Sequence, residues 1–319
     1  MELDRVPVLY RAVLDEVSKV IVGQLALVEG VVVALFSEGS VLVEGAPGLG
    51  KTLLVNVLAR TVSCAFKRVQ FTPDLMPTDL TGHSVYDMNE RKFYFNPGPI
   101  FTNILLADEI NRSPPKTQSA LLEVMQEHQV TVDGRTYPIK RPFLVMATQN
   151  PLEHEGTYPL PEAQVDRFMF KLFVDYPTVQ QETDILKHYA SGKDPRRLAG
   201  FELKPVLQGT DVLDVQQAVA KVIVEPKVIS YMAAIVTKTR EWPSVSFGAS
   251  PRGSVNLFLS SRTIAACRGR DFVTPDDVKE VAPWVLRHRL RLRPEAEIEG
   301  VTTDQVVEQV LDAVPVPRS

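Results

Sequence analysis

Hydrophobic and polar positions follow different patterns in the two parts of this chain. In the first part, apolar runs at 40–44, 104–107, 143–148 and 170–174 are typical of strands that are buried on both faces. Residues 67–71 alternate between apolar and polar and add a further strand. Helical periodicity separates most of these strands, and strands that alternate with helices predict a mostly parallel α/β sheet.

The second part of the chain lacks strand-like runs and has helical periodicity instead. Its predicted helices cover 180–189, 211–222, 227–241, 251–267, 276–288 and 303–314. We therefore predict an α/β core at 1–178 and an all-helical domain at 179–319. Two hairpins are predicted inside the core, at 83–96 and at 129–139, the second around an Asp-Gly pair.

Composition narrows the class of protein and its surroundings. The chain has 319 residues, of which 45% are hydrophobic and 23% charged, so it can form two ordinary folded domains. No apolar run approaches the roughly 20 residues of a membrane span, and we expect no membrane insertion. Only Cys64 and Cys267 are present, far apart, which favours the reducing cytoplasm. A net charge of −4 makes nucleic acid an unexpected partner.

The strongest chemical signal is a phosphate-loop pattern, G-x-x-x-x-G-K-[ST], between a predicted strand and a predicted helix. Its backbone N–H groups can surround phosphate oxygens, because glycines allow tight turns and close approach. Lys51 can reach the β- and γ-phosphates, and the Thr52 hydroxyl can bind Mg²⁺. The pattern predicts that a nucleoside triphosphate binds to Gly45, Ala46, Pro47, Gly48, Leu49, Gly50, Lys51 and Thr52.

Hydrolysis also requires a metal ligand, a group that activates water and positive charge. Asp108 and Glu109 end an apolar strand, so we expect Asp108 to hold Mg²⁺ and Glu109 to polarise the attacking water. Asn150 follows another buried strand and should reach the same sheet edge, where it can hydrogen-bond the γ-phosphate or the water. The alternative for Asn150 is a turn residue before Pro151.

Two arginines are candidates for the positive charge. Arg252 lies just after an expected helix cap, Ser250, where a cation is disfavoured by about 0.3–1 kcal/mol. A bound triphosphate would compensate for this cost; a solvated arginine, or one paired with a nearby carboxylate, is the alternative. Arg167 lies outside any apolar stripe and has the same alternatives.

Taken together, these segments resemble the AAA+ ATPases and, more narrowly, the MoxR family. The resemblance covers nearly the whole chain and is carried by 21–24, 45–52, 70–74, 108–112, 147–151, 155–164 and 250–252. It implies an αβα P-loop core with a C-terminal helical lid. It also implies that residues 45–52 are Walker A, Asp108 and Glu109 Walker B, and Asn150 sensor 1.

The resemblance assigns roles to residues whose pattern alone is ambiguous. Arg167 would be the arginine finger that acts on the nucleotide of a neighbouring subunit, with Arg112 as an alternative. Arg252 would be sensor 2, carried by the lid. Further nucleotide contacts would come from Ile21 and Val22, which would touch adenine, and from Leu53.

The resemblance implies ATP hydrolysis between the subunits of a ring, commonly a hexamer. The family's implied activity is chaperone-like assembly, or metal or cofactor insertion, often with a partner that bears a von Willebrand factor A domain. A DNA-dependent motor of the same clade is the alternative, and the net charge of −4 argues against it. A GTPase is disfavoured because no Asn-Lys-x-Asp segment occurs.

Overall fold

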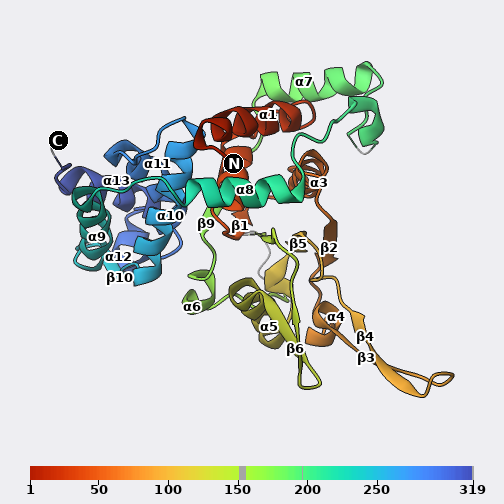
Figure 1. The fold of residues 1–319 in the computed structure, drawn as a ribbon. Helices are drawn as coiled ribbons and strands as arrows, with labels where there is room; N and C mark the ends of the chain where they lie inside the picture. Colours follow the sequence, from red (N-terminus) through yellow and green to blue (C-terminus); the bar gives the residue numbers. More distant parts are fainter. Residues whose placement is uncertain (151–155, 196, 318–319) are drawn as a thin grey trace.

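The computed structural model describes residues 1–150, 156–195 and 197–317 (Figure 1). Its centre is a five-stranded sheet with the strand order β2-β5-β8-β1-β9, in which all neighbours are parallel. The strands are β1 (Val41–Glu44), β2 (Phe66–Gln70), β5 (Ile104–Asp108), β8 (Leu144–Gln149) and β9 (Phe170–Phe173). Four of these strands are those that the apolar runs predict, β2 is the one that alternation predicts, and the α/β fold is confirmed.

Helices cover both faces of the sheet, which explains why its central strands are continuously apolar. Val43 and Leu106 face one hydrophobic cluster, which they share with the helices on that side. Leu105 and Val145 face the opposite cluster, beneath a single long helix. The helices of the core are α1 (Val6–Ser18), α2 (Leu25–Phe36) and α3 (Lys51–Thr61) on the first side and α5 (Pro115–Glu127) on the second.

Two antiparallel hairpins extend from the core on the side away from the lid (Figure 1). They lie where the sequence pattern indicates them. The rings of Phe95 and Tyr137, one from each hairpin, stack with centroids 4.1 Å apart. The first hairpin follows the short helix α4 (Pro77–Thr81) and comprises β3 (Gly82–Asp87) and β4 (Lys92–Pro97); the second comprises β6 (Gln129–Val132) and β7 (Arg135–Pro138).

The C-terminal part is helical, as predicted, but it also contains a short antiparallel ribbon of β10 (Val245–Phe247) and β11 (Arg291–Leu292). The expectation of an all-helical lid is corrected here: strands this short are below the length at which alternation can be recognised. The remaining helices are α6 (Glu162–Val165), α7 (Val179–Ala190), α8 (Gly209–Val219), α9 (Pro226–Arg240), α10 (Pro251–Cys267), α11 (Pro275–Leu286), α12 (Pro294–Ile298) and α13 (Thr303–Ala313).

Core and lid share a continuous hydrophobic cluster and several polar contacts. The Gln216 side chain on α8 donates a hydrogen bond to the Leu35 carbonyl of α2, at 2.7 Å. The hydroxyls of Ser37 and Thr263 are also 2.7 Å apart, joining the end of α2 to α10. The boundary near residue 178 stays a prediction. No helix in the described part of the chain is long and apolar enough to cross a membrane.

Leu106 tests how far the buried sheet stabilises the core, because its side chain is 0% exposed on the strand that ends at Asp108. We expect Leu106→Ala to lower the free energy of unfolding by about 2–5 kcal/mol, through lost burial and a cavity. Urea denaturation measures this. Val8→Ala is the control: Val8 is exposed on α1, and its replacement should change stability by no more than about 0.5 kcal/mol. Equal effects of the two changes would contradict the assigned core.

Candidate active site

The phosphate loop spans the residues between the end of β1 at Glu44 and the start of α3 at Lys51. Gly48 and Gly50 have φ angles of +83° and +79°, in the left-handed region that favours glycine. The space around both Cα atoms is open: apart from the chain neighbours, no described atom lies within 4 Å of the place that a Cβ would occupy. At Gly45 a Cβ would lie 2.7 Å from the Val174 carbonyl oxygen. The loop therefore requires these glycines and leaves its backbone accessible.

The N-terminus of α3 and the Lys51 side chain make this loop suitable for an anion. No side chain caps the helix, so the N–H groups of its first turn and the positive end of its dipole face the loop. The Lys51 ammonium donates to the carbonyls of Gly45 and Ala46, at 2.7 and 3.3 Å. Burial lowers the pKa of Lys51, and nearby carboxylates partly offset that effect.

A cavity of about 440 Å³ brings the loop together with the ends of three other strands. Its lining contains the predicted Lys51, Thr52, Asp108, Glu109 and Asn150. In a parallel sheet the carboxyl ends of the strands meet at one edge, so these residues converge although they are far apart in sequence. Other lining residues are Pro47, Gly48, Leu49, Gly50, Leu53, Arg68, Gln70, Thr148 and Gln149.

Thr148 fixes the backbone and side chain of the acidic pair. Its buried hydroxyl donates to the Asp108 carboxylate at 2.6 Å and accepts from the Glu109 backbone N–H at 2.9 Å. Glu109 itself has a φ of +56°, which is unusual for a residue with a side chain and turns the chain sharply after β5. Thr148 lies in one of the segments that carry the family resemblance, 147–151. The hydrophobic pattern around it indicated only a buried strand.

Side chains of β2 also contact the acidic pair, and sequence reasoning assigned them no role. Arg68 forms an ion pair with Asp108 at 2.8 Å. Gln70 donates to Glu109 at 2.7 Å, and Arg112 lies 3.1 Å from the same carboxylate oxygen. Arg68 and Gln70 are two residues apart on a strand that pairs with β5. Their alternation on a predicted parallel strand was the signal that could have found them.

An apolar cavity of about 220 Å³ adjoins the phosphate loop. The predicted residues Ile21, Val22 and Leu53 line it. Ile185 and Tyr189 of α7 close the other side, and sequence reasoning missed both because α7 reads only as a helix. Its apolar lining and its place beside the loop suit a flat aromatic base.

The oxygen donors predicted to hold Mg²⁺ fit such an ion in kind and in place. The Thr52 hydroxyl and the Asp108 carboxylate are hard oxygen ligands, and both line the cavity of the phosphate loop. Mg²⁺ commonly binds through one or two protein oxygens together with water and substrate phosphates. In the structure Asp108 is shared between Arg68 and Thr148, so metal binding would compete with the ion pair to Arg68.

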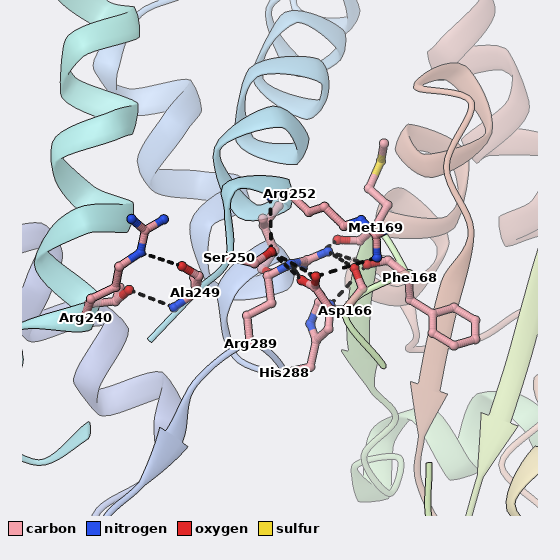
Figure 2. A network of polar contacts seen from close by, with 11 residues as sticks. Asp166, Phe168, Met169, Arg240, Ala249, Ser250, Arg252, His288 and Arg289 are labelled. Atoms are coloured by element: carbon pink, nitrogen blue, oxygen red, sulfur yellow. Dashed lines mark hydrogen bonds and ion pairs between the residues drawn. The ribbon is translucent and has the colours of Figure 1, made fainter. Parts of the chain in front are cut away.

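The structure places the two predicted arginines away from this cavity. Arg167 lies in the turn between α6 and β9 and is half-buried. Within the described part of the chain, its guanidinium makes no hydrogen bond or ion pair. Arg252, in the first turn of α10, is 47% exposed and lies 3.8 Å from the Asp166 carboxylate (Figure 2). The positive charge of Arg252 at the start of α10 is thus compensated by the Asp166 carboxylate.

Two residues of the recognised segments, Pro151 and Glu155, lie outside the described residues. The remaining predicted residues define the class of protein. A phosphate loop on β1, an acidic pair on β5 and a polar side chain after β8 meet at one edge of a parallel sheet. This arrangement is that of a P-loop nucleoside triphosphatase.

Comparison with known proteins gives the family. Residues 40–170 match the ATPase family associated with various cellular activities (AAA), and residues 237–310 match the AAA lid domain. The chain is 47% identical to Chaperone MoxR1 of Mycobacterium tuberculosis, over 95% of this chain and 81% of that protein. It is 46% identical to YeaC of Bacillus subtilis, over 98% and 95%. Protein MoxR of Methylorubrum extorquens is 31% identical, over 95% and 93%.

A solved structure agrees with these relatives. A crystal structure of a protein from Cytophaga hutchinsonii has a TM-score of 0.90 and 42% sequence identity, over 98% of this chain and 96% of that one. This chain belongs to the MoxR family of AAA ATPases. The resemblance recognised from the sequence is confirmed, and with it ATP hydrolysis as the activity of the class.

Thr148→Val tests whether the hydroxyl of Thr148 organises the acidic pair. The change keeps the shape of the side chain but leaves the part-buried Glu109 N–H without its acceptor, at a cost of about 1 kcal/mol in stability. We expect ATP turnover to fall as well, because Asp108 loses a fixed hydrogen bond. Urea denaturation and phosphate release measure the two effects. Thr148→Ser, which retains the hydroxyl, should preserve both; a silent Thr148→Val would contradict this role.

Proposed function

We propose that this protein hydrolyses ATP, with Mg²⁺, at sites shared between neighbouring subunits of a ring. The observation that carries the proposal is the position of Arg167. It lies outside the cavity of its own phosphate loop, and its guanidinium has no partner among the described residues. An arginine that is half-buried yet unpaired is suited to meet an anion supplied by another molecule.

The cations inside the cavity do not replace such an arginine. Lys51 would bind the β- and γ-phosphates, and Arg68 is neutralised by its ion pair with Asp108. The charge that develops on the transferred phosphoryl group requires further positive charge. A neighbouring subunit that supplies Arg167 would complete the site. The proposed assembly is a hexamer, on the strength of the family resemblance.

The other residues divide the remaining tasks. Glu109 would polarise the attacking water, and Asn150 would hydrogen-bond the water or the γ-phosphate at the same sheet edge. Mg²⁺, held by Thr52 and Asp108, would neutralise charge on the phosphates. Arg252 would act as sensor 2, exchanging Asp166 for the triphosphate. Ile21 and Val22 would contact adenine in the apolar cavity beside the loop.

We further propose that hydrolysis drives chaperone-like remodelling of client proteins. One relative is named a chaperone, and the first hairpin carries apolar side chains that suit a protein client. Phe93 and Tyr94 lie on β4 of this hairpin, where they could contact a client or pack within the hairpin. Phe93 is 70% exposed and Tyr94 is 53% exposed. The Phe93 ring also packs against the Tyr86 ring, with the two centroids 5.0 Å apart. The exposure of Phe93 and Tyr94 favours contact with a client.

We propose that this activity takes place in the cytoplasm. Cys64 and Cys267 are both free, which agrees with a reducing cytoplasm. A partner with a von Willebrand factor A domain is proposed from the family resemblance alone. Assembly, or metal or cofactor insertion, is the class of outcome that such a pair would serve.

Arg167→Ala tests the shared site directly. We expect ATP binding to be retained and turnover to fall about 10³-fold or more, since arginine fingers contribute 10³–10⁵ in related phosphoryl transfers. Isothermal titration and phosphate release measure the two quantities. Arg112→Ala, made in parallel, tests whether Arg112 rather than Arg167 is the arginine finger: a larger loss of turnover in Arg112→Ala would assign the role to Arg112. Full turnover by Arg167→Ala, or full turnover by the wild-type protein at dilutions where it is monomeric, would contradict the proposal.

A further inference from the structure

A buried arginine of the lid, Arg289, holds the backbone on both sides of Arg167. Its side chain is only 1% exposed. One terminal nitrogen, Nη2, donates to the carbonyl oxygens of Asp166 and Phe168, at 2.9 and 2.6 Å. These are the residues immediately before and after Arg167 in the sequence. A single guanidinium therefore holds the peptide unit that precedes Arg167 and the one that follows Phe168, and so brackets the turn that carries Arg167. Figure 2 shows Arg289 beside Asp166 and Phe168.

The other nitrogens of Arg289 complete the attachment. Nε donates to the Asp166 carboxylate at 2.8 Å, and Nη1 donates to the Met169 carbonyl at 3.2 Å. Nη1 also donates to the Val285 carbonyl at the end of α11. Burial lowers the pKa of Arg289 to about 10, partly offset by Asp166, so the group stays charged at neutral pH. All three guanidinium nitrogens of Arg289 therefore donate hydrogen bonds, a pattern that the single ammonium nitrogen of lysine cannot reproduce.

The same cluster reaches the helix that carries Arg252. The Ser250 hydroxyl, the N-cap of α10, donates to both carboxylate oxygens of Asp166, at 2.8 and 3.0 Å. It also accepts from the Arg252 backbone N–H. Asp166 thus lies between Arg289 and the start of α10 (Figure 2). The turn that presents Arg167 is bound to the lid at two points.

We propose that Arg289 is a positioning residue for Arg167. Through the carbonyls of Asp166 and Phe168 it sets the direction of the finger that serves the neighbouring subunit. Through Asp166 it also links that finger to the N-terminus of α10 in its own subunit. This inference rests on the shared site of the proposed function, so its test must separate the two.

Mixed oligomers make that separation. Glu109→Gln subunits lack the activating carboxylate but can supply a finger; Arg167→Ala subunits have a complete phosphate site but no finger. Each should be nearly inactive alone. Mixed, they should recover turnover at interfaces that combine the intact Glu109 of one with the intact Arg167 of the other. Failure of this parent mixture would overturn the shared site itself, independently of Arg289.

Arg289→Met is then added to one partner at a time. In the finger-supplying Glu109→Gln subunit, we expect it to lower the recovered kcat by about 10²-fold, the cost of a misplacement near 1 Å. In the Arg167→Ala subunit there is no finger to position, and Arg289 reaches the nucleotide site only indirectly, through Asp166 and the start of α10, so any loss of kcat should be at least 10-fold smaller. Unchanged turnover with Arg289→Met in the finger-supplying subunit would overturn the proposal. An equal loss of turnover in both placements would also overturn it, because a general structural role would affect either subunit alike.

Arg287→Met is the matched control. Arg287 is also a largely buried lid arginine, but its ion pair is with Asp304 of α13, at 2.9 Å. We expect it to leave the recovered turnover unchanged when placed in the finger-supplying subunit. Thermal unfolding and size-exclusion chromatography of each variant check folding and assembly. If Arg289→Met does not fold, Arg289→Lys gives the same test: it keeps the charge near Asp166 but loses the paired hold on the two carbonyls, and the same directional loss is expected.

Discussion

The parallel pairing of β1 with β8 and β9 is the constraint on which the whole site depends. In this register Val43 lies beside Thr148 and Glu44 beside Gln149, so the phosphate loop leaves the sheet at the level where β8 presents its polar residues. β5 pairs with β8 on the other side and ends at Asp108. A slip of one residue would turn every one of these side chains to the opposite face. Such a slip is disfavoured because side chains of different size would enter the two close-packed clusters on either face of the sheet.

Acidic side chains around the site are each held by donors from a different element. Asp108 is bound by Arg68 and Thr148, and Glu109 is contacted by Gln70. Asp166 is held in the same way by the lid. A carboxylate fixed by several hydrogen bonds keeps one geometry, and breaking such contacts is costly in a partly buried site. Nucleotide binding would therefore exchange one defined set of contacts for another, rather than order a flexible site.

The sequence was sufficient for the features that are local. Residues 45–52 are contiguous and the acidic pair directly follows an apolar run, so spacing alone predicts the phosphate loop, Asp108 and Glu109. Their supports could not be read in this way: Thr148 is 40 residues from Asp108, and Arg289 is 123 residues from Asp166. Such contacts depend on strand order and on lid packing, which leave no periodic pattern. The short ribbon of the lid escaped for a related reason, since its strands are only three and two residues long.

The stacking of Phe95 on Tyr137 has a mechanical consequence. Phe95 also packs edge-on against Phe101, shortly before β5 begins, and the second hairpin returns directly to β8. The roots of both hairpins are therefore continuous with the two strands that present Asp108 and Thr148. The stacked rings of Phe95 and Tyr137 join the two hairpins. A tilt of these strands on nucleotide binding would therefore move both hairpins together.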